Sequence, residues 1–293
     1  MEFLSQIING LGLGSIYALM ALGYSMVYGI VQLINFAHGD IIMVGSYVTF
    51  VFFITMGMPL WAAALIAVAA CALFGVFIEK VAYQRLLDIG APRISLLITA
   101  IGVSIFLQNL FQLLFSSSGK SIPNVLPSFP IFIGDLQVSS VTVITVGVSV
   151  ILMIALQLLV KKTKMGKAMR ATSEDAGAAQ LMGINPKNTI AFTFAIGSAL
   201  AAVGAVLYCG AYAQITPFMG GMLGLKAFVA AVLGGIGSIP GAMIGGYMIA
   251  IAESLTKALG GSQITDAVVF GILIIVLLVK PTGLLGKNVK EKV

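Results

Sequence analysis

The chain has 293 residues, of which 59% are hydrophobic and 9% are charged, whereas about 25% of the residues of a globular protein are charged. Its 16 basic and 10 acidic side chains are too few to cover a soluble surface, and the mean hydropathy of +1.09 agrees. The composition predicts an integral membrane protein and excludes a soluble enzyme, a disordered linker and a nucleic-acid-binding protein. The net charge of +6 then indicates basic cytoplasmic loops.

Eight apolar runs follow one another along the chain. Each is expected to be helical, because only helices and closed barrels satisfy backbone hydrogen bonds in lipid, and none alternates as barrel strands do. The sequence therefore predicts an all-α polytopic membrane protein, a single transmembrane domain over residues 1–293 with about eight to nine transmembrane segments, some broken or re-entrant. The runs are residues 9–31, 41–57, 60–78, 94–115, 138–160, 190–213, 225–256 and 264–279.

Basic residues gather in three polar stretches. Segments 79–93, 161–189 and 280–293 together hold 13 of the 16 basic residues. Because Lys and Arg are enriched in cytoplasmic loops, all three stretches are expected to be cytoplasmic. The loop 116–137 has Lys120 as its only basic residue and is expected on the outer side.

The run 225–256 is expected to be a broken or re-entrant pair of helices. Lys187 and Lys280 lie in stretches assigned to the same side, so the chain between them must cross an even number of times. The two pieces, 225–238 and 241–256, would each reach only about 21–24 Å, less than the hydrocarbon core. The interruption is marked by Gly235, Gly237, Pro240 and Gly241.

A second interruption lies near the start of the chain, at Asn35, His38 and Asp40. Polar groups at a helix break either face a cavity or cap the broken helix, so these residues are assigned to a pathway or to the break itself. Related strings follow the two breaks, MVGSY at 43–47 and MIGGY at 243–247. They indicate a weak internal repeat, and interrupted segments in corresponding halves are typical of transporters.

The basic stretch 161–189 is expected to contain one short amphipathic helix. Small and apolar residues over 176–182 form one face, and Gly183 and Pro186 end the helix. Such a helix either docks in a groove of a cytosolic partner or lies on the lipid surface, and the residues alone leave both alternatives open. The residues that suit its N-terminus are Thr172, Ser173, Glu174 and Asp175.

This stretch also resembles the cytoplasmic coupling loop of ABC importer permeases for branched-chain amino acids. The similarity lies in the strings GKAMRA, ED and LMGIN, which begin at residues 166, 174 and 181. Further similar strings cover nearly the whole chain, at 21–29, 34–40, 101–109 and 226–246, and the resemblance is closest to the LivH-type permease. It implies ATPase-coupling roles for Gly166, Arg170, Glu174, Asp175, Leu181, Gly183 and Asn185.

The resemblance implies a permease subunit in the bacterial inner (plasma) membrane that imports leucine, isoleucine and valine. It implies several partners: a LivM-type second permease, two ATP-binding subunits and a periplasmic or lipid-anchored amino-acid-binding protein. Membrane lipid would surround the chain, and no nucleic acid would bind. No catalytic residue, metal or cofactor is expected on this chain, because ATP and Mg²⁺ would bind the ATP-binding subunits.

Two other classes of function fit the sequence less well than an importer permease. An ion-coupled secondary amino-acid transporter needs an unpaired intramembrane carboxylate, but Glu253 has Lys257 four residues away, which favours a salt bridge over a proton relay. An intramembrane enzyme needs a catalytic dyad, which the single His38 and the scattered acids do not supply. Lys226 either attracts a carboxylate or extends to the membrane interface.

Overall fold

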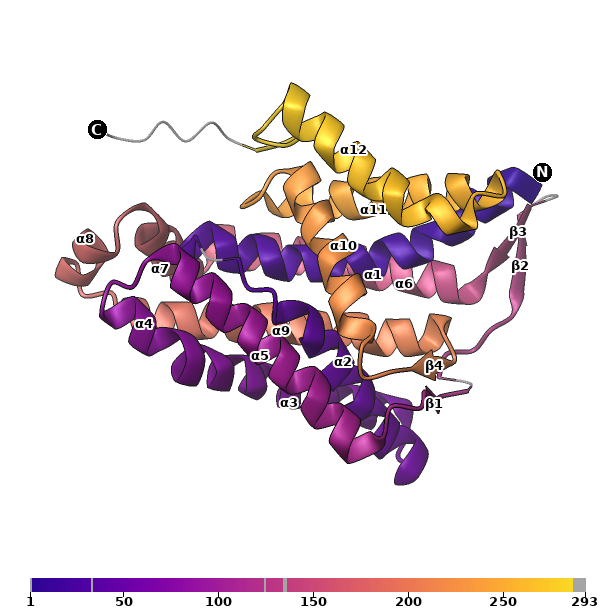
Figure 1. Ribbon diagram of the computed structural model, residues 1–293, viewed down its shortest axis with the longest axis horizontal. Coiled ribbons are helices and arrows are strands. Elements are labelled where there is room, and N and C mark those ends of the chain that lie inside the picture. Colours follow the sequence, from indigo (N-terminus) through magenta and orange to yellow (C-terminus); the bar gives the residue numbers. More distant parts are fainter. Residues whose placement is uncertain (1, 33, 124, 134–135, 287–293) are drawn as a thin grey trace.

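The computed structural model describes residues 2–32, 34–123, 125–133 and 136–286. It is a bundle of long helices with small strand pairs at one end (Figure 1). Within these residues, eight helical segments are long and apolar enough to cross a membrane, and a ninth apolar helix is shorter. The chain is therefore an all-α multi-pass membrane protein, as predicted.

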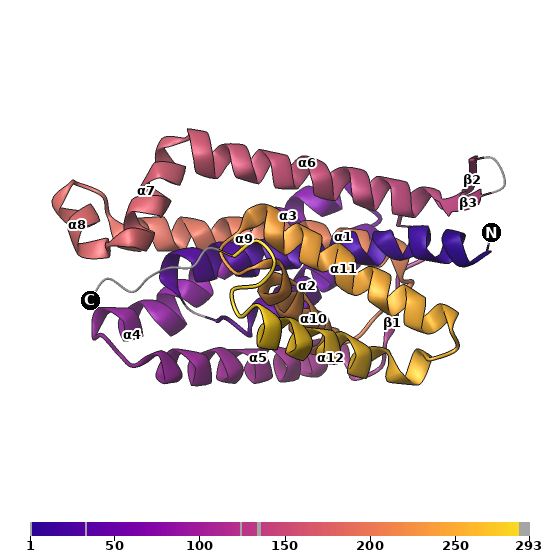
Figure 2. The ribbon, with the colours of Figure 1, turned by 90° about the horizontal axis from the view of Figure 1, so that it is seen from above.

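Four long helices form the interior of the bundle and are at least half buried over their apolar windows. They are α1 (Glu2–Val31), α2 (His38–Thr49), α9 (Pro186–Ala211) and α11 (Ile239–Ala258). Four others lie at the periphery with most of their surface uncovered by the chain, as lipid-facing helices do (Figure 2). These are α3 (Leu60–Ile78), α5 (Arg93–Phe115), α6 (Ser140–Lys162) and α12 (Thr265–Val279).

The span that begins at Leu60 is longer than the predicted run 60–78, and other spans also contain π-helical or 3₁₀ segments. The π-helix Phe50–Thr55 continues α2, and the 3₁₀ turn Ser262–Ile264 precedes α12. The π-helix Glu79–Tyr83 leads from α3 into α4 (Gln84–Asp88). The polar stretch 79–93, which was not expected to be helical, is thus helical over its first ten residues, since no Gly or Pro interrupts the helix before Gly90.

Glycines set the spacing of the interior helices. A Cβ added at Gly14 of α1 would lie 2.9 Å from the Ala250 Cβ of α11, and one added at Gly246 would lie 2.6 Å from the Ala18 nitrogen. Real Cβ atoms do not approach this closely, so α1 and α11 touch through their backbones. Small residues permit such contact between membrane helices, where packing and not water drives association.

The two ends of the molecule differ in charge. α4, α7 (Lys164–Glu174) and α8 (Ala176–Leu181) lie at one end (Figure 1). The basic stretches 79–93 and 161–189 therefore share an end, and the described part of the third stretch, residues 280–286, lies beside the end of α10. Lys287, Lys290 and Lys292 lie outside the described residues.

The opposite end carries the strands. β1 (Lys120–Ser121) pairs antiparallel with β4 (Gln214–Ile215), and β2 (Pro130–Ile133) pairs antiparallel with β3 (Leu136–Ser139). The predicted outer loop 116–137 is therefore partly a hairpin, and residues after α9 join it. Two-residue strands carry too short a pattern to be recognised from sequence.

The break in the run 225–256 is real, but only one of its helices is short. α10 (Met219–Gly234) has 16 residues, about 24 Å of helix. α11 has 20 residues and is long enough to span, so the prediction of two short pieces is wrong for α11. It begins at Ile239 because Pro240 fits a first helical turn, where its missing N–H leaves no bond unmade.

Candidate functional site

A sharp corner joins α6 to α7. Thr163 begins α7, and its hydroxyl accepts a hydrogen bond from the Gly166 nitrogen at 3.0 Å while donating to the Leu159 carbonyl at 2.7 Å. A Cβ added at Gly166 would lie 2.3 Å from the carbonyl oxygens of Leu159 and Val160. Gly166 therefore allows α7 to fold back against α6, and α7 also contacts α9 and α1.

The stretch 161–189 contains two helices and not the single one predicted. Thr172, Ser173 and Glu174 form the last turn of α7, and only Asp175 begins a helix. Its Oδ1 accepts hydrogen bonds from the nitrogens of Gly177 and Ala178 at 2.8 and 2.9 Å. The helix α7 was missed because its Lys residues suggested a loop, although Lys, Ala, Met and Arg all favour helices.

The apolar face of α8 is left uncovered by the chain. Ala179 is buried, but Leu181 is 90% exposed and Met182 is 84% exposed. Gly183 ends the helix with a positive φ of 83°, which a glycine adopts without strain. Two adjacent large apolar side chains at a polar end of a membrane protein form a surface suited to docking.

The remaining predicted coupling residues frame this surface. Arg170 is exposed and donates from Nη2 to the Lys161 carbonyl at 3.4 Å, and Glu174 is also exposed. Asn185 begins α9, its side chain accepting from the Asn188 nitrogen at 3.3 Å. The structure thus brings the seven predicted residues together on one segment between α6 and α9.

The first helix break holds its polar residues inside the protein. Asn35, His38 and Asp40 are each at most 2% exposed. Asn35 Oδ1 accepts from the Tyr83 hydroxyl at 2.7 Å, and Asp40 Oδ1 accepts from Gln108 Nε2 at 3.0 Å. The start of α2 has no side-chain cap, so the interpretation of Asp40 as a capping residue is wrong.

Three buried polar atoms beside this break have no partner among the described residues: Tyr24 Oη, His38 Nε2 and Asp40 Oδ2. The Tyr24 and His38 rings meet edge to face with centroids 4.8 Å apart. Leaving a buried polar group unsatisfied costs about 1–3 kcal/mol, so these atoms are candidates for contact with a transported molecule.

The Tyr24 hydroxyl and the Asp40 carboxylate lie against α10, whereas His38 Nε2 lies beside Gly23 of α1. A Cβ added at Gly224 would lie 3.2 Å from the Tyr24 hydroxyl and 2.6 Å from Gly39 Cα, and one added at Gly220 would lie 2.7 Å from Asp40 Oδ1. The short helix α10 therefore packs its glycines directly on the start of α2. A small movement of α10 would open this polar region.

The second break lies beside the end of α1. Gly235 and Gly237 have positive φ of 105° and 87°, as residues that reverse a chain require. The Gly237 nitrogen donates to the Ser25 hydroxyl of α1 at 2.8 Å. Pro240 lies in the first turn of α11, and the Gly241 nitrogen donates to Ser238 Oγ at 3.3 Å.

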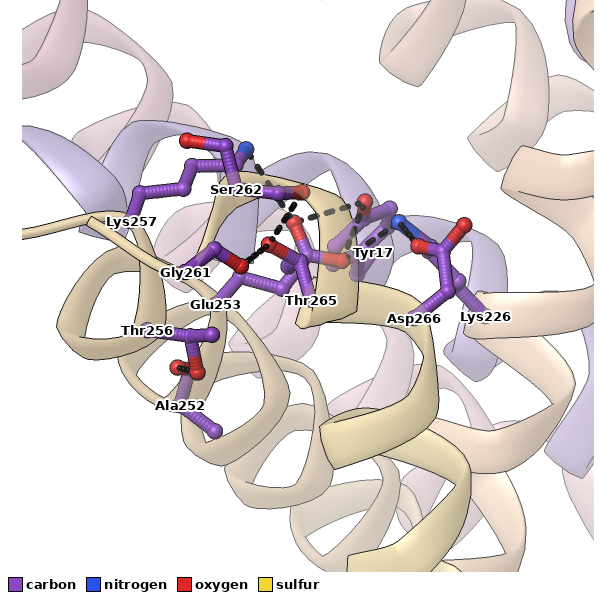
Figure 3. Close-up of polar contacts among 10 residues, drawn as sticks. All are labelled: Tyr17, Lys226, Ala252, Glu253, Thr256, Lys257, Gly261, Ser262, Thr265 and Asp266. Carbon is purple, nitrogen blue, oxygen red and sulfur yellow. Dashed lines mark hydrogen bonds and ion pairs between the residues drawn. The ribbon is translucent and has the colours of Figure 1, made fainter. Parts of the chain in front are cut away.

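A cluster of charges around the buried Glu253 links four helices (Figure 3). Lys226 of α10 lies 2.7 Å from Glu253 Oε1 of α11 and 2.7 Å from Asp266 Oδ1 of α12. Lys257 approaches Glu253 Oε2 at 3.6 Å, and the Tyr17 hydroxyl of α1 donates to Glu253 at 3.2 Å. The predicted Glu253–Lys257 pair is present, but Lys226 pairs within the bundle and does not extend to the membrane interface.

The sequence analysis did not predict the hydrogen-bond and ion-pair partners of the residues at the first break and in the charge cluster. Tyr17, Tyr83, Gln108 and Asp266 were not selected as candidates, although Gln108 is a polar residue inside an apolar run and could have been flagged on that ground. Within the described residues, no group of three His, Cys, Asp or Glu side chains could hold a metal ion.

Comparisons with known proteins agree along the whole chain. The model of a family described as branched-chain amino acid transport system / permease component matches residues 6–278. The permease protein BraD of a high-affinity branched-chain amino acid transport system of Pseudomonas aeruginosa is 46% identical, over 100% of this chain and 98% of BraD. LivH of Escherichia coli K12 is 45% identical, over 99% of this chain and 98% of LivH.

A more distant relative extends the same pattern. A probable branched-chain amino acid transport permease protein LivH of Methanocaldococcus jannaschii is 32% identical, over 94% of this chain and 90% of that protein. These matches extend over nearly the whole chain, so the entire bundle is similar to one family. The chain belongs to the family of branched-chain amino acid transport permease components, which confirms its resemblance to the LivH-type permeases.

Proposed function

We propose that this chain is the transmembrane permease subunit of an ABC importer that carries leucine, isoleucine and valine inward, driven by ATP hydrolysis on separate subunits. The observation that carries the proposal is α8, which presents Leu181 and Met182 uncovered at the end that holds the basic stretches. Family membership supports the cargo, since the relatives are named as branched-chain amino acid permeases. Family membership supports a multi-pass membrane protein, and the bacterial inner (plasma) membrane is its proposed location.

The basic end is the cytoplasmic end in this proposal, following the enrichment of Lys and Arg in cytoplasmic loops. Each of two ATP-binding subunits would offer a groove to one permease subunit, and α8 would dock there. ATP and Mg²⁺ would bind those subunits and not this chain. The alternative in which α8 lies on lipid is less favoured, because Leu181 and Met182 follow an acidic N-cap and not a cationic face.

Movement of the docked segment would pass directly into the bundle. α7 follows α6 after the single residue Thr163, and α9 begins at Pro186, five residues after α8. A push on α8 therefore reaches α6 and α9 through short, capped connections. α9 packs on α1, α2 and α3, the helices that surround the first break.

The pathway would run between α1, α2 and α10. Among the described residues, Asp40 and Tyr24 each keep a buried atom without a partner beside α10, which suits an amino acid's ammonium and carboxylate groups in an open state. Gly235, Gly237, Pro240 and Gly241 would let α10 move relative to α11. Tight cargo recognition would remain with the separate binding protein.

The opposite end would receive that periplasmic or lipid-anchored binding protein. The strand pairs there form part of the surface, and Tyr208 and Tyr212 help to line a cavity of about 530 Å³ beside β1 and β4. The peripheral helices would contact membrane lipid and a LivM-type second permease.

An ion-coupled secondary transporter is the other function considered. It needs an intramembrane carboxylate free to exchange a proton or cation. Glu253, at 1% exposed, contacts Lys226, Lys257 and Tyr17. A carboxylate with three partners is a poor ion relay, which favours the importer.

Replacing Leu181 and Met182 together by Ser is expected to abolish ATP-dependent leucine import, because docking of α8 loses its apolar contacts. Each side chain contributes about 1.5–3 kcal/mol when fully buried, so the ATP-binding subunits should also be lost on co-purification. Leu259→Ser is the matched control, since Leu259 is 79% exposed at the end of α11, outside the segment 161–189. Normal import by the double variant would contradict the coupling assignment.

A further inference from the structure

A cavity of about 700 Å³ lies at the basic end of the molecule. Its walls come from the end of α1, from the π-helix and α4, from α7 and α8, and from the start of α9. Volumes of about 300–1,000 Å³ are usual for small-molecule sites. The cavity is separate from the polar region at the first break and from the uncovered side chains of α8.

Two buried polar atoms in this cavity have no partner. Glu79 is 1% exposed and Thr172 is 5% exposed, yet Glu79 Oε2 and Thr172 Oγ1 make no hydrogen bond within the part of the chain that the structure describes. They come from different parts of the chain, the π-helix after α3 and the last turn of α7. A buried carboxylate without a partner is costly, so the pair points to a ligand that donates hydrogen bonds and carries positive charge.

The other walls supply the complementary features of an amino acid. Lys187 lines the cavity and is held 2.6 Å from Asp88, with its side chain 54% exposed. Its ammonium can meet a carboxylate at the rim. Apolar walls complete the site through Ile30, Val31, Leu87, Ile184 and Ile190.

We propose that this cavity binds a free branched-chain amino acid from the cytoplasmic side. The ligand's ammonium group would donate to Glu79 Oε2 and Thr172 Oγ1, its carboxylate would face Lys187, and its branched side chain would pack on the apolar wall. The choice of amino acid rests on the proposed function, whereas the cavity and its unpartnered atoms do not. An ammonium could also come from a phosphatidylethanolamine headgroup, and the test separates the two sources.

Binding at this place would act on coupling. Ala176, Gly177 and Gln180 of α8 line the same cavity as α4, so a bound ligand would fix α8 relative to the membrane helices. The segment that must move during the ATP cycle would then be held. Imported amino acid accumulating in the cytoplasm would slow further import.

The direct test measures binding of radiolabelled leucine to the purified transport complex. The complex is reconstituted without its binding protein in nanodiscs of phosphatidylcholine and phosphatidylglycerol. Glu79→Gln is expected to weaken leucine binding at least about tenfold, since it removes a charged hydrogen-bond acceptor. Thr172→Val should weaken binding severalfold, and Thr99→Val, which alters a threonine of α5 outside the cavity, should not change it.

Ligand analogues test the assigned orientation. Leucinol keeps the ammonium group and should compete with leucine, whereas isocaproate lacks it and should not compete. Absence of leucine binding by the wild-type complex, or binding unchanged by Glu79→Gln, would overturn the proposal. A complex that retains phosphatidylethanolamine through Glu79 and binds no leucine would assign the cavity to lipid, and would overturn it equally.

Import into vesicles separates this proposal from the proposed function. Vesicles with ATP inside are preloaded with leucine or with glycine, and the ratio of the two import rates is compared within each variant. Leucine preloading should slow the wild type severalfold and leave Glu79→Gln nearly unaffected. Equal ratios would refute the cavity site alone, whereas import independent of ATP would refute the proposed function.

Discussion

Lys226→Met is expected to lower the thermal unfolding midpoint of the detergent-purified protein by on the order of 5–10 °C. The substitution removes the cation that lies 2.7 Å from both Glu253 and Asp266. Glu253 is 1% exposed, so its carboxylate would remain buried with Lys257 at 3.6 Å as its nearest cation. Breaking one partner of a buried pair costs about 3–5 kcal/mol because the other charge stays unpaired.

Two further variants show that the loss comes from the stranded charge. Lys257→Met removes the same kind of side chain, but Lys257 is 49% exposed, so its loss should cost at most about 1 kcal/mol. The double variant Lys226→Met with Glu253→Gln removes both buried charges and should recover part of the stability. If Lys226→Met lowered the midpoint no more than Lys257→Met, the cluster would not hold α10 to α11 and α12.

Gly39→Ala is expected to disrupt the contact between α2 and α10 and to reduce both stability and import. The added Cβ would lie 2.5 Å from the Gly220 carbonyl oxygen and 2.7 Å from Gly224 Cα. These are backbone atoms, which cannot turn away as a flexible side chain can. Overpacking of this kind costs about 1–3 kcal/mol, and the displaced α10 would no longer close on Asp40.

The matched control for this change is Gly147→Ala on α6. No atom lies within 4 Å of the Cβ position at Gly147, and alanine favours a helix. Thermal unfolding and leucine import should both remain at wild-type levels. A Gly39→Ala protein that behaves like the control would show that α2 and α10 do not approach as closely as described.

The spans were predictable because their apolar runs are long and uninterrupted. The break at Gly235 and Gly237 was also predictable, since both residues adopt the positive φ that glycine permits. The extension of α3 through Glu79 to Asp88 was not predictable in the same way. Its charged residues indicated the end of the membrane span, although no Gly or Pro ends the helix there. Local pattern identifies helices better than it identifies their ends.

The contacts within the candidate sites could not be predicted. The Tyr83 hydroxyl donates a hydrogen bond to Asn35, which lies 48 positions earlier in the chain. Lys226 of α10 pairs with Asp266 of α12, and the whole of α11 separates them in the sequence. Such pairs depend on how helices pack, and one sequence carries no record of that packing. In the sequence, Lys226 is consistent both with a position at the membrane interface and with an ion pair inside the bundle. Only the position of α12 in the fold decides between them.

In the proposed function, ATP hydrolysis on partner subunits drives leucine import through this chain. Leucine uptake is therefore measured in proteoliposomes that hold either the full complex or this chain alone. We expect leucine uptake only with the full complex, with ATP on the side of α8 and the binding protein on the opposite side. Leucine uptake by the chain alone under a proton gradient would contradict it.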